Sequence, residues 1–326
     1  MNKIETDIKE YGYVNKKYEG SNIVKDINKL KKEKNAIILA HFYQIPEIQD
    51  IADFIGDSLA LSQKAGTTDA EMIVFCGVHF MAETAKLISP QKKVVLPDMN
   101  AGCSLADNCS DKDFKNFKNK YPNYTVITYI NSSAEIKALS DIICTSSNAE
   151  KIVNALPKSQ KIIFAPDKNL GSYVMKQTGR DMVLWDGTCE VHDVLQLETV
   201  INLKKQHTDA KLIAHPECKA PLLEIADFVG STTALLSFIQ KDVTKKFIVA
   251  TETGIIHQMK KLAPEKEFII VPNEENCSCN DCPYMKLNTL EKLYFCMKYE
   301  KPEIILDENF MDKAREPIIR MLELSK

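Results

Sequence analysis

Short apolar runs alternate with amphipathic, helix-like stretches along most of the chain, and this order of segments occurs three times. The three copies open with the runs IILAHFYQ (37–44), VITYINSS (126–133) and LIAHPECK (212–219). Each run has the length of a strand, ends in a polar residue and carries a second polar residue two positions later. The resulting pairs are His41 and Tyr43, Tyr129 and Asn131, and His215 and Glu217.

The spacing after each pair is also repeated. An aspartate stands 12 residues after the first polar residue of each copy, and a hydroxyl residue stands 5 residues after that aspartate. The aspartates are Asp53, Asp141 and Asp227, and the hydroxyl residues are Ser58, Ser146 and Thr232. A spacing that recurs three times indicates one structural unit in three copies.

A third apolar run, a helix-like stretch and a fourth apolar run complete each copy. The third runs cover 71–77, 161–167 and 246–252, and the fourth runs cover 92–98, 181–187 and 267–273. Short, continuously apolar strands separated by helices are typical of parallel βαβ units. The pattern therefore predicts an α/β fold of three similar three-layer α/β/α domains, each with a roughly four-stranded parallel sheet.

The repeat also predicts the domain limits. We expect domains over residues 1–108, 109–192 and 193–283, with helices in 284–326 packing back on the first domain. Polar residues follow the strands at their C-terminal ends, which is where open α/β sheets bind ligands. Three such edges facing one another would form a central site with pseudo-threefold symmetry. The alternative is three independent copies of a common layer, without a shared site.

Composition excludes several classes of protein. The 326 residues are 44% hydrophobic and 27% charged, with a net charge of −3, which indicates a globular protein and argues against a nucleic-acid partner. No apolar run approaches the roughly 18 residues of a membrane span, and the charged N-terminal segment has no signal-peptide core. We therefore expect a cytoplasmic protein with no membrane partner. Walker A, GxGxxG, GxSxG and HExxH motifs are absent from the sequence.

The ten cysteines, without a secretory signal, indicate thiols kept for a metal or for chemistry rather than for disulfides. A cysteine-bearing loop follows the fourth run of each copy. These loops hold Cys103, then Cys189, then the group Cys277, Cys279 and Cys282. Three thiolates delivered to a common axis suit an iron–sulfur cluster or zinc. Spacing alone favours Cys277 as the third ligand, because it lies closest behind its strand.

Hydroxyl residues stand where a strand gives way to a helix in each copy. They are Ser58, Ser146, Ser231 and Thr232. They could cap the helices, or they could bind an anion together with the free N–H groups of a helix N-terminus. The strand-end pairs add imidazole, phenol and carboxylate groups, which transfer protons in enzymes. His192, three residues after Cys189, is a further candidate.

A set of short motifs resembles the quinolinate synthase family over residues 20–300. The motifs include AHFYQ (40–44), GDSL (56–59), NAGCSLAD (100–107), TYINSSAE (128–135), WDGTCEVH (185–192), HPEC (215–218) and CPYMKLNTL (282–290). The resemblance implies condensation of iminosuccinate with dihydroxyacetone phosphate to quinolinate, phosphate and water, in NAD biosynthesis. It also implies three α/β domains and one 4Fe–4S cluster with three cysteine ligands and one open iron, which acts as a Lewis acid.

The matching motifs imply that the cluster ligands of this chain are Cys103, Cys189 and Cys282. The third differs from the cysteine that spacing favours, because the family's ligand lies in the segment that matches CPYMKLN. The chain has CxCxxC where a common family pattern is CxxCxxC, which leaves the roles of Cys277 and Cys279 open.

The resemblance implies Tyr43, His215 and Glu217 as acid–base residues. It also implies most of the residues expected to bind substrate, and His192 and Ser231 are added to them because of their positions in the chain. The full set is His41, Ser58, Tyr129, Ile130, Asn131, Ser146, His192, His215, Pro216, Glu217, Ser231 and Thr232. The expected partners are the two small-molecule substrates and an upstream enzyme that produces iminosuccinate.

Two other functions fit the same residues. One is an aconitase-like hydro-lyase that acts on a different hydroxy acid through the open iron. The other is an iron–sulfur redox sensor without enzymatic activity. The number of expected anion sites suits a second, phosphorylated substrate and therefore favours the quinolinate reaction.

Overall fold

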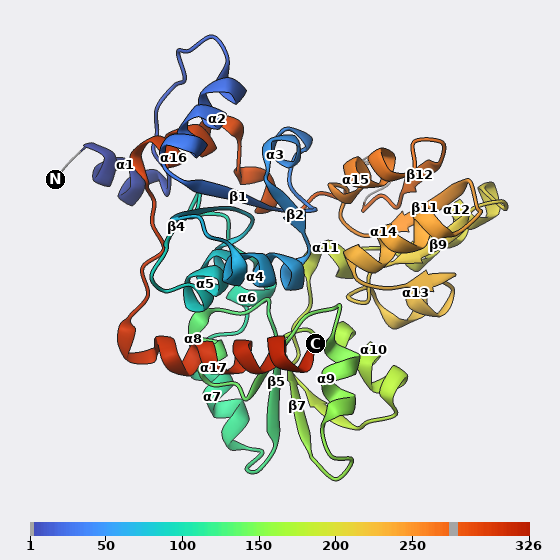
Figure 1. Ribbon diagram of the computed structural model, residues 1–326. Coiled ribbons are helices and arrows are strands. Elements are labelled where there is room, and N and C mark those ends of the chain that lie inside the picture. Colours follow the sequence, from blue (N-terminus) through green and yellow to red (C-terminus); the bar gives the residue numbers. More distant parts are fainter. Residues whose placement is uncertain (1–2, 274–279) are drawn as a thin grey trace.

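Three parallel sheets of four strands each, flanked by helices, make up the computed structural model, which describes residues 3–273 and 280–326 (Figure 1). The strand orders are β2-β1-β3-β4, β6-β5-β7-β8 and β10-β9-β11-β12, so the same topology occurs three times. All strand pairs within the three sheets are parallel. The predicted α/β fold class is confirmed.

The elements of the first copy begin with two N-terminal helices. Its strands are β1 (Ala36–His41), β2 (Phe54–Gly56), β3 (Met72–Cys76) and β4 (Lys93–Val95). Its helices are α1 (Lys3–Tyr11), α2 (Ile23–Glu33), α3 (Pro46–Ile51), α4 (Ser58–Thr67), α5 (His79–Ile88) and α6 (Ser104–Asp107).

The second and third copies follow the same order. The second has β5 (Thr125–Tyr129), β6 (Ile142–Cys144), β7 (Ile162–Ala165), β8 (Met182–Leu184), α7 (Asp111–Asn119), α8 (Ala134–Ala138), α9 (Ala149–Ala155), α10 (Lys168–Thr178) and α11 (Glu190–Asp193). The third has β9 (Lys211–Ala214), β10 (Phe228–Val229), β11 (Lys246–Ala250), β12 (Glu267–Ile270), α12 (Leu197–Gln206), α13 (Ala220–Glu224), α14 (Thr232–Lys241) and α15 (Ile255–Leu262).

The repeated aspartates join the first two strands of each sheet. Asp53 donates its backbone N–H to the carbonyl of Ile38 at 3.0 Å, and its carboxylate accepts the Ile38 N–H at 2.9 Å. The same two bonds join Asp141 to Val126 and Asp227 to Leu212. The constant spacing of these aspartates therefore reflects how the second strand is attached to the first.

The three sheets share one apolar core. Leu39, Ile127 and Ile213, each from the opening strand of its copy, are buried members of a single continuous group of apolar side chains. Strands covered on both faces are expected to be apolar along their whole length, as these are. A shared core argues against three independent layers.

The C-terminal helices differ from the expectation in one respect. The helix α16 (Leu290–Tyr299) packs on α2 and β3 of the first copy, as expected. The helix α17 (Glu308–Leu324) instead packs mainly on α8 and β6 of the second copy, and also on α5 (Figure 1). The expectation that all of 284–326 packs on the first copy is therefore wrong for α17, whose apolar face bridges two copies. The exact domain limits stay a prediction.

Within the described residues, no helix combines the length and the apolar character that crossing a membrane requires.

Candidate active site

The opening strands of the three copies end at one pocket. His41 and Tyr129 are the last residues of β1 and β5, and His215 directly follows β9. The pocket is lined by residues of all three copies. The C-terminal edges of the three sheets therefore face a shared space, as parallel α/β sheets place their ligands.

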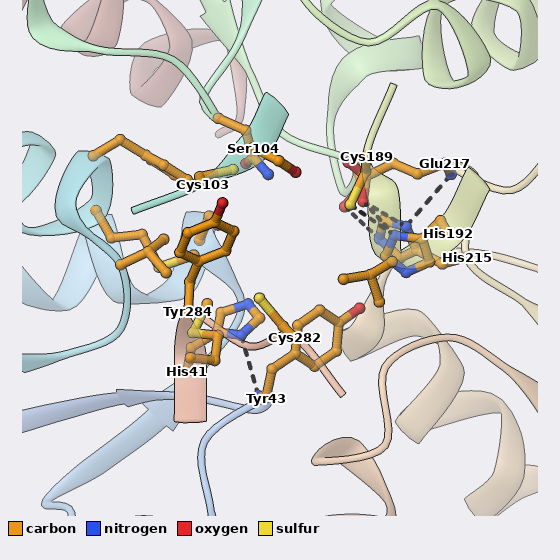
Figure 2. A pocket seen from close by; sticks show the side chains of 18 of the residues that line it. His41, Tyr43, Cys103, Ser104, Cys189, His192, His215, Glu217, Cys282 and Tyr284 are labelled. Carbon is orange, nitrogen blue, oxygen red and sulfur yellow. Dashed lines mark hydrogen bonds and ion pairs between the residues drawn. The ribbon is translucent and has the colours of Figure 1, made fainter. Parts of the chain in front are cut away.

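Three cysteines from three equivalent loops line this pocket. Cys103 and Cys189 immediately precede α6 and α11, and Cys282 precedes the short 3₁₀ helix η1 (Met285–Leu287). Figure 2 shows the three side chains around the pocket. Burial raises the pKa of Cys103 to about 12 and that of Cys282 to about 11, and it also raises the pKa of Cys189. The thiols would therefore ionise only when a positive centre binds them.

The three thiols fit a metal centre by their chemistry. All described cysteines are free thiols, and the lining of this pocket includes only three of them. Cys277, which spacing alone favoured, lies outside the described residues. A second donor set is also present, because ligand atoms of Cys189, His192 and Glu217 lie within 4.8 Å of one another.

Two buried carboxylates hold the backbone of the cysteine loops. Asp167 accepts the N–H of Cys189 at 3.1 Å, and Glu252 accepts the N–H of Cys282 at 3.0 Å. Both carboxylates occupy the same position, two residues beyond the end of the third strand of their copy. Burial raises the pKa of Glu252 to about 7, against the opposing effect of Lys286, which forms an ion pair with it at 2.7 Å.

Glu217 is the centre of a buried hydrogen-bond network. One of its oxygens lies 3.0 Å from Nδ1 of His215 and 3.3 Å from Nδ1 of His192. Burial alone would raise the pKa of Glu217, but His192, His215 and a hydrogen bond from Tyr129 outweigh it and hold the pKa below its ordinary value. The backbone N–H of Glu217 also lies 3.4 Å from Nδ1 of His215. When Nδ1 carries the ring proton it donates to the Glu217 carboxylate, and Nε2 is then free to accept a proton. That Nε2 lies 3.3 Å from the hydroxyl of Ser146.

The network continues to Tyr43 through a threonine. The hydroxyl of Thr251 lies 2.9 Å from Nε2 of His192 and 2.7 Å from the phenol oxygen of Tyr43. Burial lowers the pKa of His192 to about 3 and raises that of Tyr43, so both side chains are neutral near pH 7. Groups from all three copies are therefore joined in one path from Tyr43 to Ser146.

His41 is held as a neutral imidazole beside Tyr43. Its Nδ1 accepts the backbone N–H of Tyr43 at 3.2 Å (Figure 2). Burial lowers the pKa of His41 to about 4. Since Nδ1 accepts this bond, the ring proton is on Nε2, where it could be donated to a ligand.

The structure brings most of the predicted substrate-binding residues to the pocket. The predicted residues that line it are His41, Ser58, Tyr129, Asn131, Ser146, His192, His215, Glu217 and Thr232. Ile130, Pro216 and Ser231 are buried but do not belong to the lining. Ser231 instead caps α14, because its hydroxyl accepts the N–H of Ala234 at 3.3 Å.

Sequence reasoning missed several polar residues of the site. Thr251 and the two carboxylates Asp167 and Glu252 were not among the candidates, and neither was Asp57, which lines the pocket. The carboxylates had a signal, because they occupy equivalent positions in the second and third copies. Thr251 had none, because the equivalent residues are Gly77 and Pro166.

Known proteins resemble this chain over most of its length. Residues 25–323 match the family described as "Quinolinate synthetase A protein". The quinolinate synthase of Microcystis aeruginosa is 63% identical over 299 residues, which cover 92% of this chain and 94% of the relative. The quinolinate synthase of Synechocystis sp. is 61% identical over 303 residues, which cover 93% of this chain and 95% of the relative. The chain belongs to the quinolinate synthase family of enzymes.

Proposed function

We propose that the chain condenses iminosuccinate with dihydroxyacetone phosphate and releases quinolinate, phosphate and two waters. The observation that carries this proposal is that one pocket gathers a cysteine from each of the three copies together with the Glu217 network. The names of the relatives support the same activity. The reaction requires loss of hydroxyl groups and several proton transfers, and the pocket offers groups for both.

The residues that would hold a 4Fe–4S cluster are Cys103, Cys189 and Cys282. With three protein ligands, one iron would stay open, and the cluster when bound would supply a Lewis acid for a substrate oxygen. Asp167 and Glu252 would fix two of the ligand loops through their backbone N–H groups.

Proton transfer is assigned to the buried network. Glu217 orients the ring of His215, so that Nε2 can take a proton from a substrate atom in the pocket and return it later. Tyr43 would donate a proton to a leaving oxygen, with Thr251 holding the phenol in place. These groups lie in a largely buried pocket, where water competes little for the same protons.

The negative charges of the two substrates need partners. The chain has only Arg180, Arg315 and Arg320, and none of them lines the pocket. Ser58 and Thr232 instead stand at the first positions of α4 and α14, where backbone N–H groups are free to bind an anion. Ser146 and the Nε2–H of His41 add further donors around the same pocket.

The test is a direct assay of quinolinate after anaerobic purification and addition of both substrates. We expect quinolinate from the native chain and none from Cys103→Ala. The matched control is Cys109→Ala, which removes a buried thiol that does not line the pocket and is expected to stay active. Full activity of an iron-free chain would overturn the proposal. Turnover of a single hydroxy acid, without a triose phosphate, would instead favour an aconitase-like hydro-lyase.

A further inference from the structure

Asp57 is a buried carboxylate at the pocket that takes no part in the Glu217 network. It follows β2, caps the N-terminus of α4 and is 6% exposed. It also lines the pocket beside Ser58. A buried carboxylate requires hydrogen-bond donors. The segments that supply these donors are the segments that the carboxylate connects.

The donors to Asp57 come from all three copies. Its Oδ1 accepts the N–H of Ala60 in its own helix at 2.9 Å. Its Oδ2 accepts the hydroxyl of Ser147 at 2.7 Å and the hydroxyl of Thr233 at 2.7 Å. Ser147 belongs to the second copy and Thr233 to the third, so one oxygen joins the two other copies to the first.

The repeat shows how the residues around this contact are divided. Ser58, Ser146 and Thr232 are equivalent and all line the pocket. The next residue of each copy is Leu59, Ser147 and Thr233, respectively. The two hydroxyls in this second set do not line the pocket and are instead bound to Asp57. At the position of Asp57 itself, the other copies have Thr145 and Ser231, so the three equivalent positions supply one carboxylate.

We propose that Asp57 is a positioning residue that fixes the turns bearing Ser58, Ser146 and Thr232 around the pocket. Asp57 itself belongs to the turn that bears Ser58. The hydroxyls of Ser147 and Thr233, each next to the pocket residue of its own copy, tie the other two turns to the Asp57 carboxylate. The inference rests on the proposed function only for its kinetic consequence, which is binding of the substrates by these turns. The structural tie between the copies does not depend on which reaction is catalysed.

Asp57→Asn separates the cap from the tie. Asparagine caps helices about as well as aspartate, so α4 is expected to keep its N-terminus. Hydrogen bonds to a charged acceptor are stronger than those to an amide oxygen. If the asparagine oxygen keeps the bond from the Ala60 N–H, its NH2 group replaces the oxygen that accepts the Ser147 and Thr233 hydroxyls. We expect the KM for dihydroxyacetone phosphate to rise about tenfold or more, with a much smaller change in kcat.

Variants of the donors test the same tie without altering the carboxylate. Ser147→Ala and Thr233→Val each remove one hydroxyl, and we expect each to raise the same KM less than Asp57→Asn does. The double variant is expected to approach Asp57→Asn. The matched control is Thr178→Val, because the Thr178 hydroxyl bonds only backbone groups of its own copy, the Val174 carbonyl at 2.7 Å and the Arg180 N–H at 3.4 Å.

Hydrogen–deuterium exchange supplies a measurement that needs no catalysis. In the native chain and the variants, loaded with cofactor, we expect faster amide exchange at 145–148 and 231–234 when the tie is lost. The strands β5 and β9 are expected to exchange as in the native chain. Unchanged exchange at both turns in Asp57→Asn would overturn the inference, whatever reaction the enzyme catalyses. Faster exchange with an unchanged KM would overturn its kinetic part, and absence of quinolinate from the native chain would count only against the proposed function.

Discussion

The carboxylate of Glu252 accepts the backbone N–H of Cys282 at 3.0 Å, and its repeat equivalent Asp167 binds the N–H of Cys189 in the same way at 3.1 Å. In the first copy the equivalent residue is Val78, whose apolar side chain cannot form such a bond. Two of the three cysteine loops are therefore attached to the end of a third strand by a buried carboxylate. This relationship leads to a prediction about retention of the cofactor.

Glu252→Gln should weaken the attachment of the Cys282 loop. Glutamine keeps one oxygen but replaces the other with a donor, which then faces the N–H of Gly254. It also removes the 2.7 Å ion pair with Lys286, which keeps the longer ion pair of 3.6 Å to Asp281. We expect the loaded variant to lose iron to a chelator about tenfold faster than the native chain, since an unsatisfied buried group costs about 1–3 kcal/mol. The control is Glu265→Gln, which alters an exposed carboxylate. Equal rates of iron loss in Glu252→Gln and the native chain would contradict the role assigned to Glu252.

Thr251→Val tests the link between Tyr43 and His192. Valine has the shape of threonine but no hydroxyl, so the phenol and Nε2 of His192 both lose their partner. We expect kcat to fall about tenfold or more, because two buried polar groups become unsatisfied. Thr251→Ser retains the hydroxyl and is expected to recover most of the activity in steady-state assays. If the serine and valine variants were equally impaired, packing of the methyl group would explain the loss instead.

Glu300 makes a prediction about stability and pH. Its carboxylate bonds Lys34 at 2.7 Å and also Lys93, and these side-chain hydrogen bonds lower its pKa to about 2. The pKa is therefore lower in the folded chain than in the unfolded chain. The resulting stabilisation is complete above the ordinary carboxyl pKa and is lost as the pH falls toward about 2.

Glu300→Gln should therefore be less stable than the native chain at pH 7, with a difference that shrinks as the pH is lowered through the acid range. Urea unfolding at a series of pH values measures this difference. A difference that stays constant from pH 7 to pH 3 would show that Glu300 stabilises the fold by some means other than its charge.

The helix α17 connects two copies, and its core face should be sensitive to truncation. Ile318 is fully buried, whereas the neighbouring Ile319 is only partly buried. Ile318→Ala is expected to lower the free energy of unfolding by about 2–5 kcal/mol, because it removes packed methyl groups and leaves a cavity. Ile319→Ala is the matched control and should lower it by less. Equal losses in chemical denaturation would mean that α17 does not pack as described.

The repeat allowed most of the fold to be predicted from the sequence. Apolar runs such as 37–41 are buried on both faces of a parallel sheet, and this environment produces a strong and regular pattern. The placement of α17 on the second copy could not be predicted. Its amphipathic pattern shows that one face is buried, but the pattern contains no information on which copy covers that face.

Prediction of the site depended on position within the repeat. Cys103, Cys189, His215 and Glu217 follow strand ends, so parallel topology places each of them at the C-terminal edge of its own sheet. Asp57 and Thr251 were missed because their importance lies in contacts with other copies, such as the bond from Thr233 to Asp57. Such contacts depend on the relative orientation of the three copies, which local sequence patterns do not encode. The catalytic and ligand roles of the residues stay predictions.

The central claim is that three cysteines from three copies hold one iron–sulfur cluster with an open iron. The most direct measurement is iron and sulfide quantification after anaerobic purification, with EPR of the reduced chain in the presence and absence of dihydroxyacetone phosphate. We predict about four irons per chain and a signal that shifts when the substrate is added. Zinc, or no metal after strictly anaerobic handling, would contradict the claim.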